Sequence, residues 1–173
     1  VIKVIISSRS PKVKLYLNDK LIGEKETGKE NYTATFDVPY EPGTLKAVNS
    51  KGKEEFVLKT AGAPAAIRLI ADRSKIKACK NDLSYVKIEL VDKNGNVVPE
   101  TSLPVKIECT GKGTVIAGGN AAYADMESFR SLTPNTFRGK AIAIVQPDGE
   151  KGDIQVKVSA KGLEDASIVI TTY

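Results

Sequence analysis

The chain has 173 residues and a formal net charge of +5, with 41% hydrophobic and 27% charged residues. This composition is typical of a soluble globular protein, and no apolar run approaches the roughly 18 residues that a membrane helix needs. Because histidine is absent, the chain lacks the commonest general base and transition-metal ligand, which excludes most hydrolase triads and zinc sites.

The positive charge is dispersed along the chain. Lysines such as Lys12, Lys14, Lys87 and Lys106 occupy alternating positions among acidic residues, which is typical of the solvated face of a sheet. Nucleic acid is therefore not expected as a partner. The chain opens on VIKVII, which predicts a strand and not a signal peptide, so we expect a part of a longer protein.

Short runs of alternating apolar residues fill the first part of the chain. Turn residues separate them, first Asn18-Asp19-Lys20 and later Glu41-Pro42-Gly43-Thr44. Strands at this spacing predict a sandwich or barrel of about six strands. The runs cover residues 2–6, 13–17, 21–22, 32–38, 45–48 and 56–58.

The stretch TAGAPAA, residues 60–66, interrupts the alternation. A short segment of Ala, Gly and Pro between two strand-rich regions is a natural linker. We therefore predict a small domain over residues 1–61, a linker over 62–64 and a second domain over 65–173.

Alternation resumes after this linker, and helical periodicity is nowhere sustained. Sheets with one apolar face bury it most simply against a second sheet. The predicted fold is therefore all-β, with two tandem immunoglobulin-like antiparallel β-sandwiches, although the Cys-Trp-Cys signature of antibody domains is absent. The later runs cover residues 67–69, 86–90, 105–109, 115–116, 142–144, 154–158 and 168–170.

The run Asp92-Lys93-Asn94-Gly95-Asn96 has the outline of a calcium loop. Such a loop requires Gly at its sixth position and Glu at its twelfth, where this chain has Val97 and Leu103. Asn-Gly is a strong hairpin signal, so we predict a turn here and no metal site.

Cys79 and Cys109 are the only thiols. Cys109 falls on an apolar strand face, whereas Cys79 lies in the polar stretch KACKND. This placement favours a buried free thiol and a loop thiol, with a disulfide as the alternative.

A long connection, GGNAAYADMESFRS, spans residues 118–131. Asp125 and Glu127 suggest the carboxylate pair of a glycosidase, but that chemistry needs a deep cleft, which a loop on a small sandwich does not offer. Long loops often carry binding residues. We therefore expect the loop either to contact a ligand or a neighbouring domain or to form an ordered cap over the sandwich edge; the candidate contact residues are Asn120, Tyr123, Asp125, Glu127 and Phe129.

Several landmarks resemble the C-terminal domains of family 2 glycoside hydrolases. SPKVKLYLNDKLIG (10–23) and VPYEPGTLKAV (38–48) resemble the small domain that follows the catalytic barrel. IRLIADRSKIKACKNDLSYVKIELVDKNGNVVP (67–99), a later GGN, ESFRS (127–131) and Phe137-Arg138-Gly139-Lys140-Ala141 resemble the C-terminal immunoglobulin-like domain. The chain departs from the family pattern at Asn18-Asp19, where Asn-Gly is usual, and at Gly119-Asn120-Ala121-Ala122, where a Gly-Asn-Gly-Asp type run is usual.

The resemblance implies the non-catalytic end of a bacterial β-galactosidase-like enzyme, with its catalytic residues in an upstream barrel of the same polypeptide. It implies no catalytic, metal or cofactor residue in this chain, a periplasmic, secreted or cell-surface location, and a possible homo-oligomer. A structural scaffold beside the barrel is the expected function. The alternatives are a carbohydrate-binding module that holds a glycan, which a cluster of exposed tyrosines would favour, and an adhesin-type surface stalk.

Overall fold

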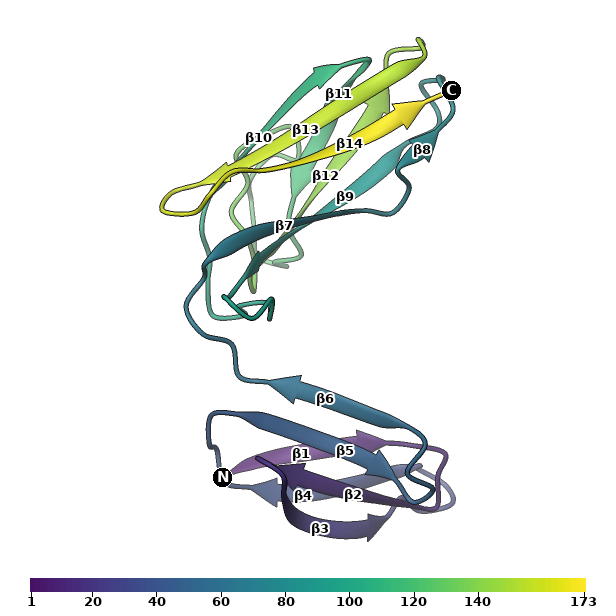
Figure 1. Ribbon diagram of the computed structural model, residues 1–173, viewed down its shortest axis with the longest axis vertical. Coiled ribbons are helices and arrows are strands. Elements are labelled where there is room, and N and C mark those ends of the chain that lie inside the picture. The colour runs from purple at the N-terminus through teal and green to yellow at the C-terminus, as the bar shows by residue number, and fades with distance from the viewer. The chain divides into compact units, whose positions relative to one another are not determined.

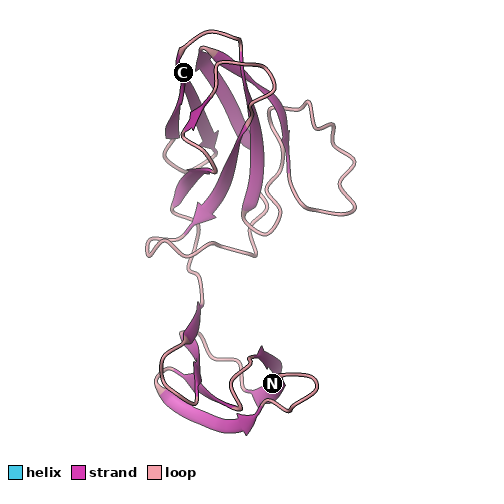
Figure 2. Ribbon diagram, turned by 90° about the vertical axis from the view of Figure 1, so that its right-hand side faces the viewer, coloured by secondary structure: helices cyan, strands magenta, loops and turns pink.

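The computed structural model describes residues 1–173 and consists of strands joined by turns and loops (Figures 1 and 2). The chain divides into two compact units, Val1–Thr60 and Ala61–Tyr173. Residues at the junction bond within the second unit, because Gly62 N donates to Asp92 Oδ2 at 2.9 Å and Ala65 N donates to Val91 O at 2.8 Å.

The first unit consists of two antiparallel sheets of unequal size. One sheet has the order β3-β2-β5-β6, and the other is the pair β1-β4. Apolar residues that alternate along β2 and β4 meet between the sheets, with Val13, Leu15 and Phe36 almost fully buried. The strands are β1 (Ile2–Ser7), β2 (Lys12–Leu17), β3 (Lys20–Glu26), β4 (Thr33–Val38), β5 (Thr44–Asn49) and β6 (Glu55–Lys59).

The second unit is a sandwich of two four-stranded sheets, ordered β10-β13-β14-β8 and β11-β12-β9-β7. The first two strands of this unit belong to different sheets. β7 pairs antiparallel with β9, whereas β8 pairs parallel with β14. The strands are β7 (Ala66–Ala71), β8 (Lys75–Ile76), β9 (Ser84–Val91), β10 (Val105–Gly111), β11 (Gly113–Gly119), β12 (Lys140–Pro147), β13 (Gly152–Ala160) and β14 (Ala166–Thr172).

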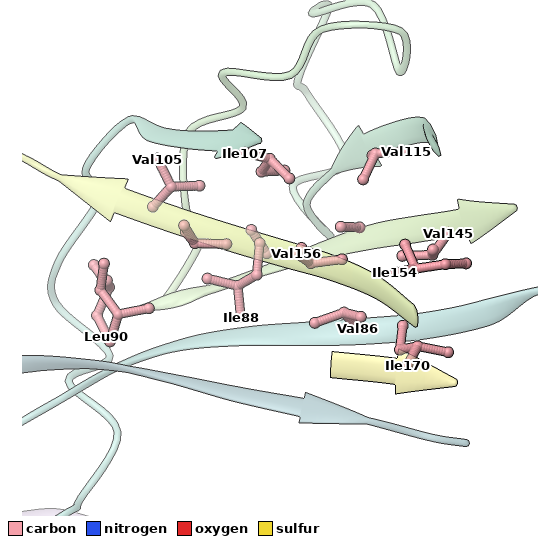
Figure 3. Packing of buried hydrophobic residues seen from close by; sticks show 14 of the residues in the cluster. Val86, Ile88, Leu90, Val105, Ile107, Val115, Val145, Ile154, Val156 and Ile170 are labelled. Carbon is pink, nitrogen blue, oxygen red and sulfur yellow. The ribbon is translucent and has the colours of Figure 1, made fainter. Parts of the chain in front are cut away.

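The core of the second unit lies between these two sheets (Figure 3). Val86, Ile88 and Leu90 alternate along β9 and are fully buried, as are Ile154 and Val156 of β13 in the facing sheet. Alternation with period two places these side chains on one face of each strand. The predicted fold class, two immunoglobulin-like antiparallel β-sandwiches, is confirmed.

The tight turn between β2 and β3 has an unusual backbone conformation. Asn18 and Asp19, between β2 and β3, both have positive φ values of 50° and 63°. A two-residue hairpin turn of this type requires positive φ at both central positions, and Asn and Asp tolerate it better than most residues. The departure from Asn-Gly at this turn therefore leaves the hairpin intact.

Candidate functional site

The turn after β9 is organised around the carboxylate of Asp92. Its Oδ1 accepts hydrogen bonds from Asn94 N at 2.9 Å and Asn96 N at 2.8 Å, and its Oδ2 accepts from Gly62 N and from the side-chain amide of Asn96. These hydrogen bonds, led by that of Gly62, lower the pKa of Asp92 from 3.8 to about 2. Asp92 is therefore a structural acceptor that joins this turn to the start of the unit.

A second carboxylate, Glu89, is nearly buried in the same part of the unit. Burial alone would raise the pKa of Glu89, but hydrogen bonds from Arg68 and Lys87 outweigh this effect and lower it. The guanidinium of Arg68 binds Glu89 Oε2 at 2.6 Å and also donates to Gly95 O at 2.9 Å. Arg68 thus links β9, β7 and the turn that follows β9. Sequence reasoning did not single out this pair, because only the strand register places Arg68 opposite Glu89.

The connection from β11 to β12, residues 120–139, has two parts. The protruding part covers residues 120–131, and the second part, residues 132–139, runs beside β10. In the second part, Ile107 N donates to Leu132 O at 2.8 Å and Val105 N donates to Pro134 O at 3.0 Å. Thr136 N in turn donates to Leu103 O at 2.8 Å. These bonds satisfy backbone groups along the edge of β10 that would otherwise be open to pairing with another chain.

Polar side chains hold the protruding part in shape. The side-chain amide of Asn120 donates to Asp125 Oδ2 at 2.5 Å and to Asn135 O at 2.9 Å. Asp125 Oδ1 accepts from Glu127 N, and Asn135 Nδ2 donates to Glu127 Oε1 at 2.7 Å. The polar candidates Asn120, Asp125 and Glu127 are therefore brought together, and they bond chiefly to one another and to the loop.

The apolar candidates lie differently. The Phe129 ring lies against Gly119, since a Cβ on Gly119 would come within 2.8 Å of it. Tyr123 is 99% exposed, and Met126, which sequence reasoning did not select, is 95% exposed. Such exposure makes Tyr123 and Met126 the members of the loop best placed to touch another molecule.

A small recess lies beside these residues, bounded by Gly118, Asn120, Asp125, Glu127 and Phe129. Its volume is about 30 Å³, which is room for one or two water molecules. A monosaccharide does not fit inside it. The recess therefore offers no cleft in which Asp125 and Glu127 could flank a glycosidic bond.

The remaining features that could carry chemistry are few. Cys79 and Cys109 are both free thiols; Cys79 is exposed, whereas Cys109 is half-buried, and burial raises its pKa. Cysteine and carboxylate side chains form no group of three or more that could hold a metal ion. The structure contains no helix that is long and apolar enough to cross a membrane.

Two tandem immunoglobulin-like sandwiches define the fold class of the chain, and comparisons with known proteins identify its family. Residues 67–169 match the model of the glycoside hydrolase family 2 C-terminal domain 5. Residues 1–56 match a domain of unknown function (DUF4982). The chain therefore belongs to glycoside hydrolase family 2, as a C-terminal part of that family, and the resemblance noted in the sequence is confirmed.

Individual relatives agree with this assignment. The chain is 32% identical to beta-galactosidase BoGH2A of Bacteroides ovatus over 95% of its own length and 20% of the relative. It is 27% identical to a beta-glucuronidase of Formosa agariphila, covering 17% of that protein. A solved family 2 member from Bacteroides cellulosilyticus superposes with a TM-score of 0.93 at 36% identity, over 99% of this chain and 23% of that one. The chain thus spans about a fifth of the length of the curated relatives it matches.

Proposed function

We propose that this chain is the non-catalytic C-terminal end of a longer β-galactosidase-like glycoside hydrolase, where it acts as a structural scaffold beside the catalytic barrel of the same polypeptide. The observation that carries the proposal is a set of exposed apolar side chains on the outer face of the sheet β11-β12-β9-β7. We call this set, Ile70, Tyr85 and Ile142, the apolar band. Exposed apolar side chains that gather on one face of a sheet favour a partner surface that covers them.

The band crosses three neighbouring strands. Ile70 of β7 and Ile142 of β12 stand on either side of Lys87, because both pair with it in register. Tyr85 lies two residues along the same face of β9, and all three apolar side chains are exposed. Alternation places them on the face opposite to the core. A protein surface laid over β7, β9 and β12 would remove them from water together.

The carboxylates of the loop support a non-catalytic role. Asp125 and Glu127 accept hydrogen bonds from loop groups, and the adjacent recess has room only for water. Acid and nucleophile in a glycosidase instead face a substrate that lies between them. The hydrolytic residues of the whole enzyme would accordingly belong to its barrel.

A carbohydrate-binding module is the alternative, because Tyr123 of this loop is fully exposed and aromatic faces stack on sugars. Tyr123 is nevertheless the only tyrosine of the loop, and the nearby recess is bordered by a single aromatic side chain, Phe129, whose ring lies against Gly119. Sugar-stacking platforms built from tyrosine need two or three rings in one concavity. The scaffold is therefore preferred, with Tyr123 contacting a neighbouring domain.

The proposal extends to the setting of the whole enzyme. A bacterial enzyme of this kind would be periplasmic, secreted or held at the cell surface. The exposed apolar band could in that setting also bury against a second copy, which would make the enzyme a homo-oligomer. Glycan enters this account as the substrate of the barrel.

Titration of residues 1–173 with galactosides and β-linked oligosaccharides, followed by calorimetry or NMR, separates the two functions. The scaffold predicts no binding at millimolar sugar concentrations. Binding at millimolar or tighter affinity that disappears in Tyr123→Ala and persists in Tyr40→Ala would establish a carbohydrate-binding module instead. Tyr40 is a suitable control because it is exposed but belongs to the first unit.

A further inference from the structure

The two layers of the first unit are unequal, since the pair β1-β4 faces the four strands β3-β2-β5-β6. An immunoglobulin-type sandwich places strands A, B, E and D in one sheet and C, F and G in the other. By their pairing, β1 and β4 correspond to B and E, and β2, β5 and β6 correspond to C, F and G. The strand A that pairs with B has no counterpart among β1 to β6.

The register of β1 identifies the backbone groups that lack a partner. Ser8 N donates to Tyr32 O at 2.9 Å and continues the ladder between β1 and β4. Because hydrogen bonding alternates along an antiparallel pair, Val4 and Ile6 also direct their backbone groups toward β4. Lys3, Ile5 and Ser7 direct theirs to the opposite edge, and β1 pairs with no second strand.

Apolar side chains are uncovered on the inner face at the same edge. Phe56 and Leu58 of β6 lie opposite Ala47 and Leu45, which pack against the core, so their side chains lie on the core-facing side of the sheet. They are nevertheless 67% and 55% exposed. The inner face of β6 therefore lacks the cover that β1 and β4 give to β2.

A recess separates β1 from β5 and β6. It has a volume of about 150 Å³, and its walls include Ile6 and Ser7 of β1, Ala47 of β5 and Phe56 of β6. An extended segment paired with β1 would lie along this recess and could direct every second side chain toward Phe56 and Leu58. One missing strand thus accounts for the free edge, the recess and the exposed inner face.

We propose that residues preceding Val1 in the full-length enzyme form a strand that pairs antiparallel with the free edge of β1 and completes this sandwich. This inference rests on the proposed function, which makes the chain the end of a longer polypeptide. Consecutive strands usually pair through a short turn. Since β4 occupies one edge of β1, a hairpin leading into Ile2 delivers its strand to the other edge and to the recess.

Amide-resolved hydrogen exchange on the full-length enzyme tests the pairing. The amides of Lys3, Ile5 and Ser7 are expected to exchange about 100-fold or more slowly than unprotected amides. Val4 and Ile6 provide the matched control within the same strand, because their amides bond to β4 in either case. Exchange of Lys3, Ile5 and Ser7 at unprotected rates, with Val4 and Ile6 protected, would overturn the proposal. Protection that depends on protein concentration would overturn it too, because it would show pairing between two copies.

Substitutions in β6 of the full-length enzyme give a second measurement. Val57 faces the outer side of the sheet and is 37% exposed, less than Phe56. Without an added strand, Val57→Ser should therefore destabilise the first unit more than Phe56→Ser. The added strand reverses this order. Phe56→Ser should then lower the melting temperature of the first unit by about 5 °C or more, and Val57→Ser should lower it less. An unchanged order would contradict the added strand. Absence of glycosidase activity in the unmodified full-length protein would instead contradict the proposed function. The hydrogen-exchange result does not depend on that activity and would still decide whether the strand is present.

Discussion

Asp92→Asn is expected to lower the melting temperature of the second unit by about 5 °C or more at neutral pH. The Asp92 carboxylate accepts four hydrogen bonds, three of them from the backbone N–H groups of Gly62, Asn94 and Asn96 and the fourth from the side-chain amide of Asn96. An asparagine has one side-chain oxygen, and its amide group can only donate. Two or more of these donors therefore lose their acceptor, and the turn loosens from the start of the unit.

The pH dependence distinguishes this explanation from a general loss of packing. The pKa of Asp92 is about 2 in the folded protein, below its ordinary value of 3.8. The stability that its charge contributes is therefore fully present above about pH 4 and is lost as the pH falls to about 2. The difference in melting temperature between wild type and Asp92→Asn should narrow across that window.

Thermal melts between pH 6 and pH 2, followed by circular dichroism, provide the measurement. Asp148→Asn is a matched control, because Asp148 is exposed and accepts a single hydrogen bond, from Glu150 N, which an amide oxygen can also accept. The control should match wild type at each pH. A difference for Asp92→Asn that stays constant down to pH 2 would show that the charge of Asp92 contributes nothing.

Gly139→Ala is the substitution with the second large expected effect. Gly139 sits in the tight turn between Phe137 and Lys140 with φ of 71°, and an added Cβ would lie 2.4 Å from Val98 O. Positive φ disfavours alanine by roughly 1 to 2 kcal/mol, and the backbone clash adds to that cost. We expect a loss of about 3 kcal/mol or more in the free energy of unfolding.

Gly162→Ala separates the two contributions. Gly162 also has positive φ, 81°, but a Cβ there would meet no atom within 4 Å. Urea denaturation should therefore show a loss of about 1 to 2 kcal/mol for Gly162→Ala and a clearly larger loss for Gly139→Ala. Equal losses would mean that the close approach of Val98 to the turn does not constrain it.

Alternation and turn chemistry made the strands and their buried faces predictable. Val86, Ile88 and Leu90 could be placed on one face from period two alone, and the structure buries all three. The two-residue strand β8 could not be predicted, because a run this short has no periodicity. Its transfer to the sheet of β14 depends on backbone pairing between residues far apart in sequence.

The candidate site was only partly predictable for the same reason. Length and composition indicated that the loop containing Asn120, Tyr123 and Phe129 was unusual. Its second half pairs with β10 through backbone atoms, which leave no mark in the side-chain pattern. Asp92 was correctly placed in a turn, but its bond to Gly62 spans 30 residues and follows from tertiary structure alone.

The thermal stability of the full-length enzyme, measured with and without residues 1–173, tests the scaffold most directly. The scaffold predicts that the enzyme truncated before Val1 melts about 10 °C or more lower, because a surface of its barrel loses the apolar band of Ile70, Tyr85 and Ile142 that packs against it. An unchanged melting temperature, with the only loss being adsorption to a polymeric glycan, would contradict the scaffold and identify a carbohydrate-binding module.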